Sequence, residues 1–312
     1  MTDLVLHHYP TSPFSEKVRL VLGMKRIPWR SVHVPRIMPK PDVVALTGGY
    51  RRTPFMQIGA DIYCDSALMC RVIDRLWPEP ALYPAATAGV ADIVAQWADT
   101  ALFWSAIPYT MQPAGVAHIF AGLPPEGVKA FGADRAAMSP AMRRAPAADA
   151  GSALVAYLDR LDAMLGDGRP YLLGAVPCIA DFSATQSIWF VRRAPPVATI
   201  LADYPDVMRW HERVAAFGQG DSTPMGSDEA IALAARTTSF APTAVAAGQP
   251  FASGDPVRIA AADYAHDEIL GTVVGLGHDE VVIERSDARA GTVHVHFPRI
   301  GFHVKAQQKD SA

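Results

Sequence analysis

Cysteine is scarce in this chain of 312 residues, which contains only Cys64, Cys70 and Cys178. An odd number of cysteines with no C-x-x-C pair argues against a disulfide framework and against a cysteine-based zinc site. Free thiols fit a reducing compartment, so we expect a cytoplasmic protein. The first residues, Met-Thr-Asp-Leu-Val-Leu, lack the basic region and the long apolar run of a signal peptide.

An excess of charge of either sign is also missing. Lys and Arg number 28 against 31 Asp and Glu, which gives a formal net charge of −3. This balance lacks the basic surface that nucleic-acid binding requires, so we expect no nucleic-acid partner. Half of the residues are hydrophobic, enough to bury sizeable cores, and the length suggests about two domains with room for a third small one.

One uncharged stretch, from Thr100 to Pro125, is long enough on paper to span a membrane. It contains Pro108 and Pro113, two glycines and a closing Pro-Pro pair, a composition that breaks a spanning helix. The pattern favours a buried helix followed by a loop. We therefore expect a soluble protein with no membrane partner.

The first 80 residues alternate between strand and helix signals. Ser12 can cap a helix that Pro13 begins, because serine accepts backbone hydrogen bonds and proline suits the first turn. Strands are expected at 4–8, 29–35, 55–58 and 61–64, and helices at 12–26, 41–46 and 66–76. The order β-α-β-α-β-β-α predicts a small mixed sheet covered by helices.

The rest of the chain divides into three further parts. Residues 87–217 are rich in alanine and predict helices at 88–110, 125–144, 151–165, 180–193 and 204–217. Residues 218–250 predict a linker with one short helix at 228–236. Short strands expected at 257–260, 269–274, 281–285, 292–297 and 302–305 predict a small all-β, barrel-like domain over 251–306.

Several short segments resemble the cytosolic glutathione transferase family. They are Ser12-Pro-Phe-Ser-Glu-Lys-Val-Arg19, Tyr50-Arg-Arg-Thr-Pro-Phe55, Asp65-Ser66, and Tyr171-Leu-Leu-Gly174 followed by Ile179-Ala-Asp-Phe182. The resemblance covers about residues 3–217. It implies a thioredoxin-like domain at 1–80, an all-helical domain at 87–217, glutathione as co-substrate, no metal, and a homodimer.

The resemblance assigns to Ser12 the role of the activating serine. The thiol of glutathione has a reference pKa near 8.5, so only a small part of it is the nucleophilic thiolate at neutral pH. A hydroxyl at a helix N-terminus stabilises a thiolate by a charge-assisted hydrogen bond and by the helix dipole. Ser12 without this role would still cap its helix, and Ser15 and Tyr9 are the alternative activating residues. A serine here disfavours reductase chemistry, which needs a cysteine that forms a mixed disulfide.

The other motifs imply where glutathione binds. Pro54 matches the family's cis-proline, which lets the backbone of Thr53 pair with the cysteinyl part of the tripeptide. Asp65 and Ser66 open a helix whose free N–H groups can receive the γ-glutamyl carboxylate, although Asp65 is shorter than the family's usual residue. Arg52, together with Arg51, can meet the glycyl carboxylate, or both can be solvated loop side chains.

The second substrate is expected between the two domains, in a pocket lined by Phe103, Trp104 and Tyr109, with Met111 nearby. The alternative for each of them is a place in the core, where such side chains at helical spacing more often lie. Asp181, three residues after Cys178, is expected to carry the capping of its helix, since cysteine caps poorly.

The extension holds five of the ten histidines. His294 and His296 lie two apart on one strand face, where they either ligate a metal with a third group or form a polar face; we expect no metal. The sequence has no G-x-S-x-G elbow, phosphate loop or dinucleotide fingerprint. The resemblance implies a glutathione transferase-like detoxification enzyme acting on an apolar electrophile by conjugation, isomerisation or dehalogenation. The alternative is a non-catalytic module of the same fold used for binding or assembly.

Overall fold

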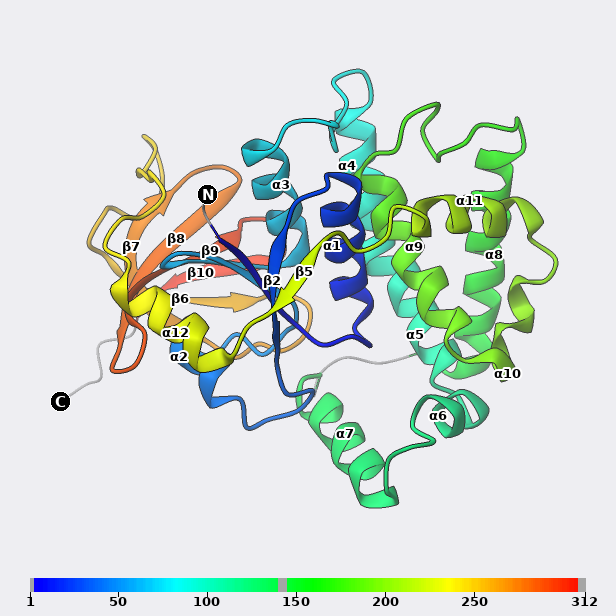
Figure 1. Cartoon of the computed structure of the whole chain (residues 1–312), viewed down its shortest axis with the longest axis horizontal. Helices are drawn as coiled ribbons and strands as arrows, with labels where there is room; N and C mark the ends of the chain where they lie inside the picture. The colour runs from blue at the N-terminus through cyan, green and yellow to red at the C-terminus, as the bar shows by residue number, and fades with distance from the viewer. Residues whose placement is uncertain (1–2, 140–144, 308–312) are drawn as a thin grey trace.

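The computed structural model describes residues 3–139 and 145–307, and its N-terminal unit has the predicted order of elements (Figure 1). These are β1 (Leu4–His8), α1 (Pro13–Met24), β2 (Trp29–His33), α2 (Pro41–Thr47), β3 (Phe55–Ile58), β4 (Asp61–Cys64) and α3 (Ser66–Leu76). Strand β1 pairs parallel with β2 and antiparallel with β3, which pairs antiparallel with β4. This is the thioredoxin-like sheet that the resemblance implied.

The helical part follows, on one side of this unit in Figure 1. It comprises α4 (Ala88–Trp97), a π-helical turn (Ala98–Leu102), α5 (Phe103–Thr110), α6 (Pro113–Ile119), α7 (Pro125–Ala137), α8 (Ala147–Leu165), α9 (Ile179–Arg192), α10 (Pro195–Ala198), a 3-10 turn (Thr199–Leu201) and α11 (Pro205–Ala215). Helix α6 was not predicted, and the end of the helix expected over 125–144 lies outside the described residues. None of the described helices has the length and apolar character needed to cross a membrane.

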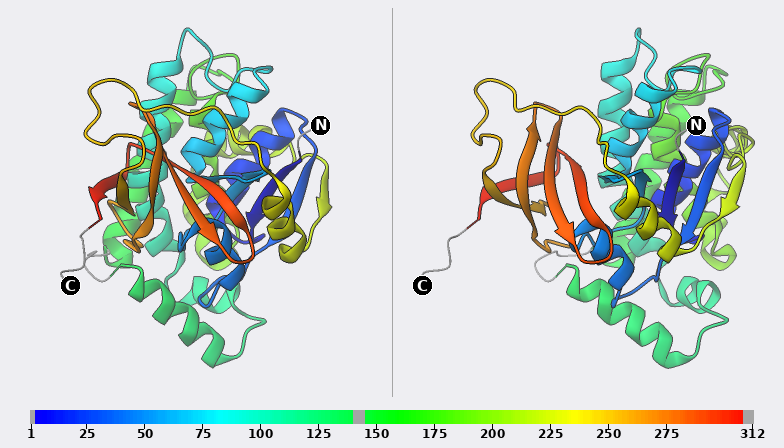
Figure 2. Two further views of the ribbon diagram at one scale, coloured as in Figure 1. Left: turned by 90° about the vertical axis from the view of Figure 1, so that its left-hand side faces the viewer. Right: turned by 60° about the vertical axis from the view of Figure 1, so that its left-hand side comes forward.

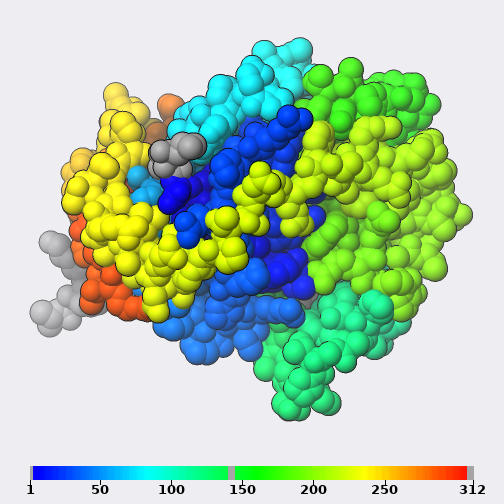
Figure 3. Space-filling view, viewed as in Figure 1, coloured from blue at the N-terminus to red at the C-terminus, as the bar shows by residue number. Residues whose placement is uncertain are grey.

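The segment expected to be a linker is attached to the N-terminal unit along its length. Its strand β5 (Ser222–Pro224) pairs parallel with β2, and its helix α12 (Ser227–Arg236) packs against α2, β2 and β9. Figure 3 shows this segment, in yellow, crossing the face of the molecule from the helical part to the extension. The backbone hydrogen bonds of β5 explain why a polar stretch adopts a fixed path.

The five strands expected in the extension are present as β6 (Pro256–Ala261), β7 (Ile269–Leu276), β8 (Glu280–Asp287), β9 (Gly291–Pro298) and β10 (Phe302–Ala306). They continue the N-terminal sheet, because β9 pairs parallel with β4 through Asp61 opposite His294 and Tyr63 opposite His296. The described strands form one ten-stranded sheet in the order β10-β6-β7-β8-β9-β4-β3-β1-β2-β5. Figure 2 shows the strands of the extension, in orange and red, beside the blue strands of the N-terminal unit. A free edge at β4 would expose unpaired backbone groups, and β9 covers it.

The shared sheet has a shared core. Leu46 of α2, Tyr50 and Phe55 are buried in one cluster with Phe297 and Phe302 of the extension. A second cluster joins α1 and α3 to the helical part. The N-terminal unit is therefore packed between the other two parts, and the candidate site lies where all three meet.

Candidate functional site

Ser12 lies at the N-terminus of α1, as predicted. Its buried Oγ accepts a hydrogen bond from the Ser15 N–H at 3.2 Å and donates to the Thr53 carbonyl oxygen at 3.4 Å. The serine therefore caps its helix and at the same time reaches the segment expected to bind the cysteinyl part of glutathione.

The Thr53–Pro54 peptide bond is cis, as the resemblance implied. It lies at the entry of β3, and both residues line a cavity of about 480 Å³ that also contains Asp65 and Ser66. We call this the Ser66 cavity. The structure therefore brings together the residues that the sequence assigned to the glutamyl and cysteinyl parts of glutathione.

Asp65 and Ser66 form the entrance to α3. Asp65 has a left-handed φ of 79° and accepts a hydrogen bond from the Ala67 N–H at 2.9 Å. A non-glycine residue in this region of φ is uncommon and is often held there by the needs of a binding site. The carboxylate of Asp65 caps the helix, and the hydroxyl of Ser66 lies beside it on the cavity wall.

A buried ion pair that the sequence did not reveal supports Ser66. Lys17 of α1 donates to Asp99 of the π-helical turn at 2.5 Å and to the Ser66 hydroxyl at 3.4 Å. Burial opposes the charge of Lys17, but Asp99 outweighs it and holds the pKa of Lys17 above its ordinary value. Asp99 also accepts from Ser183 and Gln186 of α9, so this network joins the N-terminal unit to the helical part at the wall of the Ser66 cavity.

A second cavity of about 240 Å³ contains Ser12, and we call it the Ser12 cavity. The two cavities adjoin, because both are lined by the same six residues: Phe14, Arg52, Thr53, Phe103, Trp104 and Tyr264. A ligand in the Ser66 cavity that reaches past Thr53 therefore arrives beside the Ser12 hydroxyl.

The expected second-substrate residues divide between the cavity and the core. Phe103 and Trp104 line both cavities, and Met111 lines the Ser12 cavity. Tyr109 lines neither, and its hydroxyl donates to the Val197 carbonyl at 2.9 Å inside the helical part. Tyr109 follows Trp104 by five residues in α5, which places it about 140° around a helix of 3.6 residues per turn and on another face.

Arg52 lies on both cavities, but the extension holds its guanidinium. It pairs with Asp263 and with the Tyr264 carbonyl, and its Cζ lies 4.1 Å from the centre of the Tyr264 ring. The Tyr264 ring also meets Trp104 edge to face at 5.3 Å. The loop between β6 and β7 is thus a wall of the site, which the sequence did not suggest.

The alternative activating residues differ in their access to the site. Tyr9 lines the Ser12 cavity beside Ser12. Ser15 is fully buried, lines neither cavity, and its hydroxyl has no hydrogen-bond partner among the described residues.

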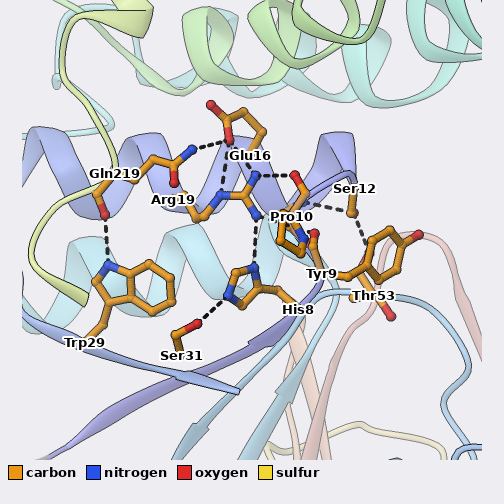
Figure 4. Close-up of polar contacts among 11 residues, drawn as sticks. His8, Tyr9, Pro10, Ser12, Glu16, Arg19, Trp29, Ser31, Thr53 and Gln219 are labelled. Carbon is orange, nitrogen blue, oxygen red and sulfur yellow. Dashed lines mark hydrogen bonds and ion pairs between the residues drawn. The ribbon is translucent and has the colours of Figure 1, made fainter. Parts of the chain in front are cut away.

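Arg19 supports the loop that leads to Ser12 (Figure 4). Its guanidinium donates to Glu16 at 2.5 Å, to the Pro10 carbonyl at 3.1 Å and to His8 Nδ1 at 2.9 Å. Burial and the nearby Arg19 lower the pKa of His8 to about 3, so the ring is neutral. Since Arg19 can only donate, His8 accepts through Nδ1 and donates from Nε2 to Ser31.

Asp181 and the three cysteines, which the sequence also singled out, are buried within the fold. Asp181 accepts from the backbone N–H groups of Cys178 and Leu172 and from Trp210, and so holds the start of α9 as expected. Burial raises the pKa of all three cysteine thiols, to about 12 for Cys70 and Cys178.

His294 and His296 have separate partners. His296 lies between Asp61 at 2.8 Å and Glu280 at 2.6 Å, whereas His294 stacks on Phe240 with ring centres 3.8 Å apart. Among the described residues, no group of three or more His, Cys, Asp and Glu side chains is arranged to hold a metal ion.

Comparison with known proteins places this geometry in a family. Residues 6–81 match the family described as glutathione S-transferase, N-terminal domain, and residues 141–213 match glutathione S-transferase, C-terminal domain. A GST-like protein of known structure from Pseudomonas syringae is 40% identical, with a TM-score of 0.80, over 98% of this chain and 100% of that chain. That coverage includes most of the extension.

Two further similarities are narrower. The β-etherase LigF from Sphingobium sp. is 17% identical with a TM-score of 0.52 over 69% of this chain and 96% of that chain, a likeness in fold alone. Pyrimidodiazepine synthase from Drosophila melanogaster is 30% identical over 76 residues, which are 23% of this chain and 31% of that protein. The two domain matches and the full-length relative agree with the paired cavities: the chain belongs to the glutathione S-transferase family.

Proposed function

We propose that this protein binds glutathione and activates its thiol through Ser12 for attack on an electrophile. The observation that carries the proposal is the position of the Ser12 hydroxyl. It lies at the N-terminus of α1, 3.4 Å from the Thr53 carbonyl, on the wall of a cavity that adjoins the Ser66 cavity. The electrophile would occupy the Ser12 cavity, against Phe103 and Trp104.

The geometry can supply the free energy that this activation needs. Lowering the thiol pKa by about two units requires about 2.7 kcal/mol of preferential stabilisation of the thiolate. A hydrogen bond to a charged group contributes about 1.5–3 kcal/mol, and a helix N-terminus about 0.3–1 kcal/mol. The Ser12 hydroxyl would exchange its bond to the Thr53 carbonyl for one to the thiolate.

The glycyl carboxylate of glutathione would lie on the basic side of the Ser12 cavity. The sequence suggested Arg51 and Arg52 for this role, but both already pair with carboxylates of the chain. Lys40 is 3% exposed, lines the Ser12 cavity, and makes no ion pair with a carboxylate among the described residues, although Asp134 is close enough to act on its charge. We therefore prefer Lys40 as the partner of the glycyl group.

The family likeness also favours a cytoplasmic homodimer with a role in detoxification. Strand β9 already covers the β4 edge, so a second copy would contact other surfaces. Val90 and Ile93 of α4 are 55% and 70% exposed and offer apolar area for such contact. Light scattering during gel filtration measures this oligomeric state.

A glutathione-affinity column and a panel of electrophiles test the function. The wild-type protein should be retained, should show the ultraviolet absorbance of a bound thiolate, and should conjugate members of the panel. Ser12→Ala should lose the thiolate absorbance and reduce turnover by roughly a hundredfold, the effect of removing about 2.7 kcal/mol. Retention without turnover would favour a ligand-binding protein, and absence of retention would favour the non-catalytic module.

Thr11→Ala is the matched control, because Thr11 also lines the Ser12 cavity but does not cap α1. It should retain the thiolate absorbance. A Ser12→Ala protein with full thiolate absorbance and full turnover would contradict the role of Ser12.

A further inference from the structure

Cationic side chains are concentrated on the wall of the Ser12 cavity. Among its described lining residues, six are Lys or Arg and none is Asp or Glu; the six are Arg36, Lys40, Arg51, Arg52, Arg135 and Arg193. The whole chain has a net charge of −3, so this concentration is a local feature. The other walls are apolar and aromatic, with Phe120, Phe131 and Phe190 added to Phe103 and Trp104.

Half of these cations already have a carboxylate partner outside the cavity. Arg135 and Arg51 both pair with Asp134 at 2.9 Å. Arg51 also pairs with Asp267 at 3.6 Å, and Arg52 pairs with Asp263. These three side chains are neutralised by the protein itself and need no ligand.

The other three cations have no carboxylate in ion-pair contact among the described residues. Lys40 donates to the Arg51 carbonyl at 3.2 Å, and the Cζ of Arg193 lies 4.9 Å from the Trp189 ring centre. Arg36 is exposed at the cavity rim. Glu16 is the carboxylate that acts on Arg193, but it is already bound by Arg19 and Gln219.

Burial and mutual repulsion both disfavour the charged forms of Arg193 and Lys40. Burial, with Arg36 and Arg19 nearby, lowers the pKa of Arg193. Burial, together with Arg135, lowers the pKa of Lys40 to about 8. Cations held close together without counter-charges are typical of a site that binds an anion.

Glutathione would provide a counter-charge for only one of these three cations. Its γ-glutamyl carboxylate belongs in the Ser66 cavity, so on this side it presents the glycyl carboxylate alone, for which Lys40 is available. Arg36 and Arg193 then remain, next to the aromatic walls.

We propose that the second substrate is an aromatic organic anion whose carboxylate or sulfonate is bound by Arg36 and Arg193. This inference rests on the proposed transferase function. The aromatic body would lie against Phe103, Trp104 and Phe190, which orient it toward Ser12. The proposal adds an acidic group to the apolar electrophile expected from the sequence.

A matched pair of electrophiles tests the charge preference in turnover. With chlorodinitrobenzoate, the thiolate sulfur forms a bond to the ring carbon that bears chlorine. The carbon–chlorine bond breaks, chloride leaves with the electron pair, and the thiol proton passes to solvent. The methyl ester reacts by the same step without the negative charge, but it withdraws electrons from the ring more strongly. Each kcat/KM is therefore divided by the rate constant of the uncatalysed reaction with glutathione, and the ratio of these normalised values for acid over ester isolates the anion site.

The ratio should exceed one by roughly tenfold in the wild type, as expected for one charge pair in a partly desolvated site. Arg193→Gln and Arg36→Gln should each reduce this ratio. Added salt should also reduce it, because salt screens the exposed charge of Arg36. The control is Arg192→Gln, since Arg192 is the neighbour of Arg193 but lines neither cavity. Thermal melting confirms that each variant is folded. If Arg193→Gln does not fold, Arg36→Gln tests the proposal, because Arg36 is exposed.

A binding measurement separates this inference from the transferase function. Anilinonaphthalene sulfonate and N-phenylnaphthylamine differ by the sulfonate and need no glutathione. The anion site would be supported if the sulfonate bound more tightly than the uncharged amine and Arg193→Gln abolished this difference. If, in addition, neither electrophile were converted, the transferase function would be refuted while the anion site stood. If acid and ester were converted with equal normalised kcat/KM, and Arg193→Gln left their ratio at one, the anion site would be overturned and the transferase function would stand.

Discussion

Arg19 is the residue on which the loop before α1 depends most. Its guanidinium and the carboxylate of Glu16 are both nearly inaccessible, with side chains 3% and 6% exposed. Removing one partner of a buried ion pair leaves an uncompensated charge. We expect Arg19→Met to lower the free energy of unfolding by about 3–5 kcal/mol, measured by urea denaturation.

The double variant Arg19→Met with Glu16→Gln provides the control. It removes both charges, so it should recover part of the lost stability, whereas two unrelated losses would add. A single Arg19→Met variant within about 0.5 kcal/mol of the wild type would contradict the supporting role.

At the same scale, the residues predicted from sequence were those whose role depends on near neighbours. Ser12 as a helix cap and Asp181 as the anchor of α9 follow from spacing within one turn. The environments of Arg52 and Lys40 depend on Asp263 and on Asp134 with Arg135, which lie far along the chain. Spacing along the sequence carries no information on such contacts.

At the scale of elements, the junction between β9 and β4 depends on His296. Its ring lies between Asp61 and Glu280, one on each side of the junction. Burial alone would lower the pKa of His296, but hydrogen bonds to Asp61 and Glu280 outweigh burial and raise the pKa above 6.5. The protonated ring therefore stabilises the fold.

The pH dependence of stability tests this junction. A raised folded-state pKa means that the stabilisation is fully present below about pH 6.5 and is lost as pH rises through the folded pKa. We expect His296→Gln to cost about 3 kcal/mol near pH 6 and progressively less at higher pH, measured by denaturation at several pH values.

His294 provides the matched control, because it lies on the same strand, two residues away. Burial lowers its pKa, so His294→Gln should not reproduce a cost that declines with rising pH. A cost of His296→Gln that stays constant from pH 6 to pH 9 would show that the ring acts by packing alone.

The strands of the extension could be predicted individually, but their partners could not. Alternation of apolar residues in segments such as Val293 to Phe297 indicates a strand and its buried face. The prediction of a separate barrel-like domain assumed that these strands pair only with one another. The pairing of β9 with β4 depends on an edge that the thioredoxin-like sheet leaves open, and that edge appears only in three dimensions.

At the scale of the whole molecule, the extension and the N-terminal unit share one core. Tyr50 meets Phe297 and Phe302, with ring centres 6.1 and 6.4 Å apart. Arg285 of β8 donates to the Ala45 carbonyl of α2 at 2.6 Å. Either unit without the other would expose this core to water, at a cost of roughly 25 cal/mol for each Å² of apolar surface.

Native-state hydrogen exchange should therefore show that the two units open together. Amides of β3 and β9 are expected to exchange with one opening free energy, because both strands pair with β4 and contribute Phe55 and Phe297 to one buried cluster. Helix α7 has no buried side chain and provides the internal standard for an element that opens independently. If the amides of β6 to β9 exchanged through an opening of lower free energy while β1 and β3 stayed protected, the extension would be a separable domain. The wall that Arg52 and Tyr264 form beside Ser12 would then open with it, so access to the site would be coupled to that local unfolding.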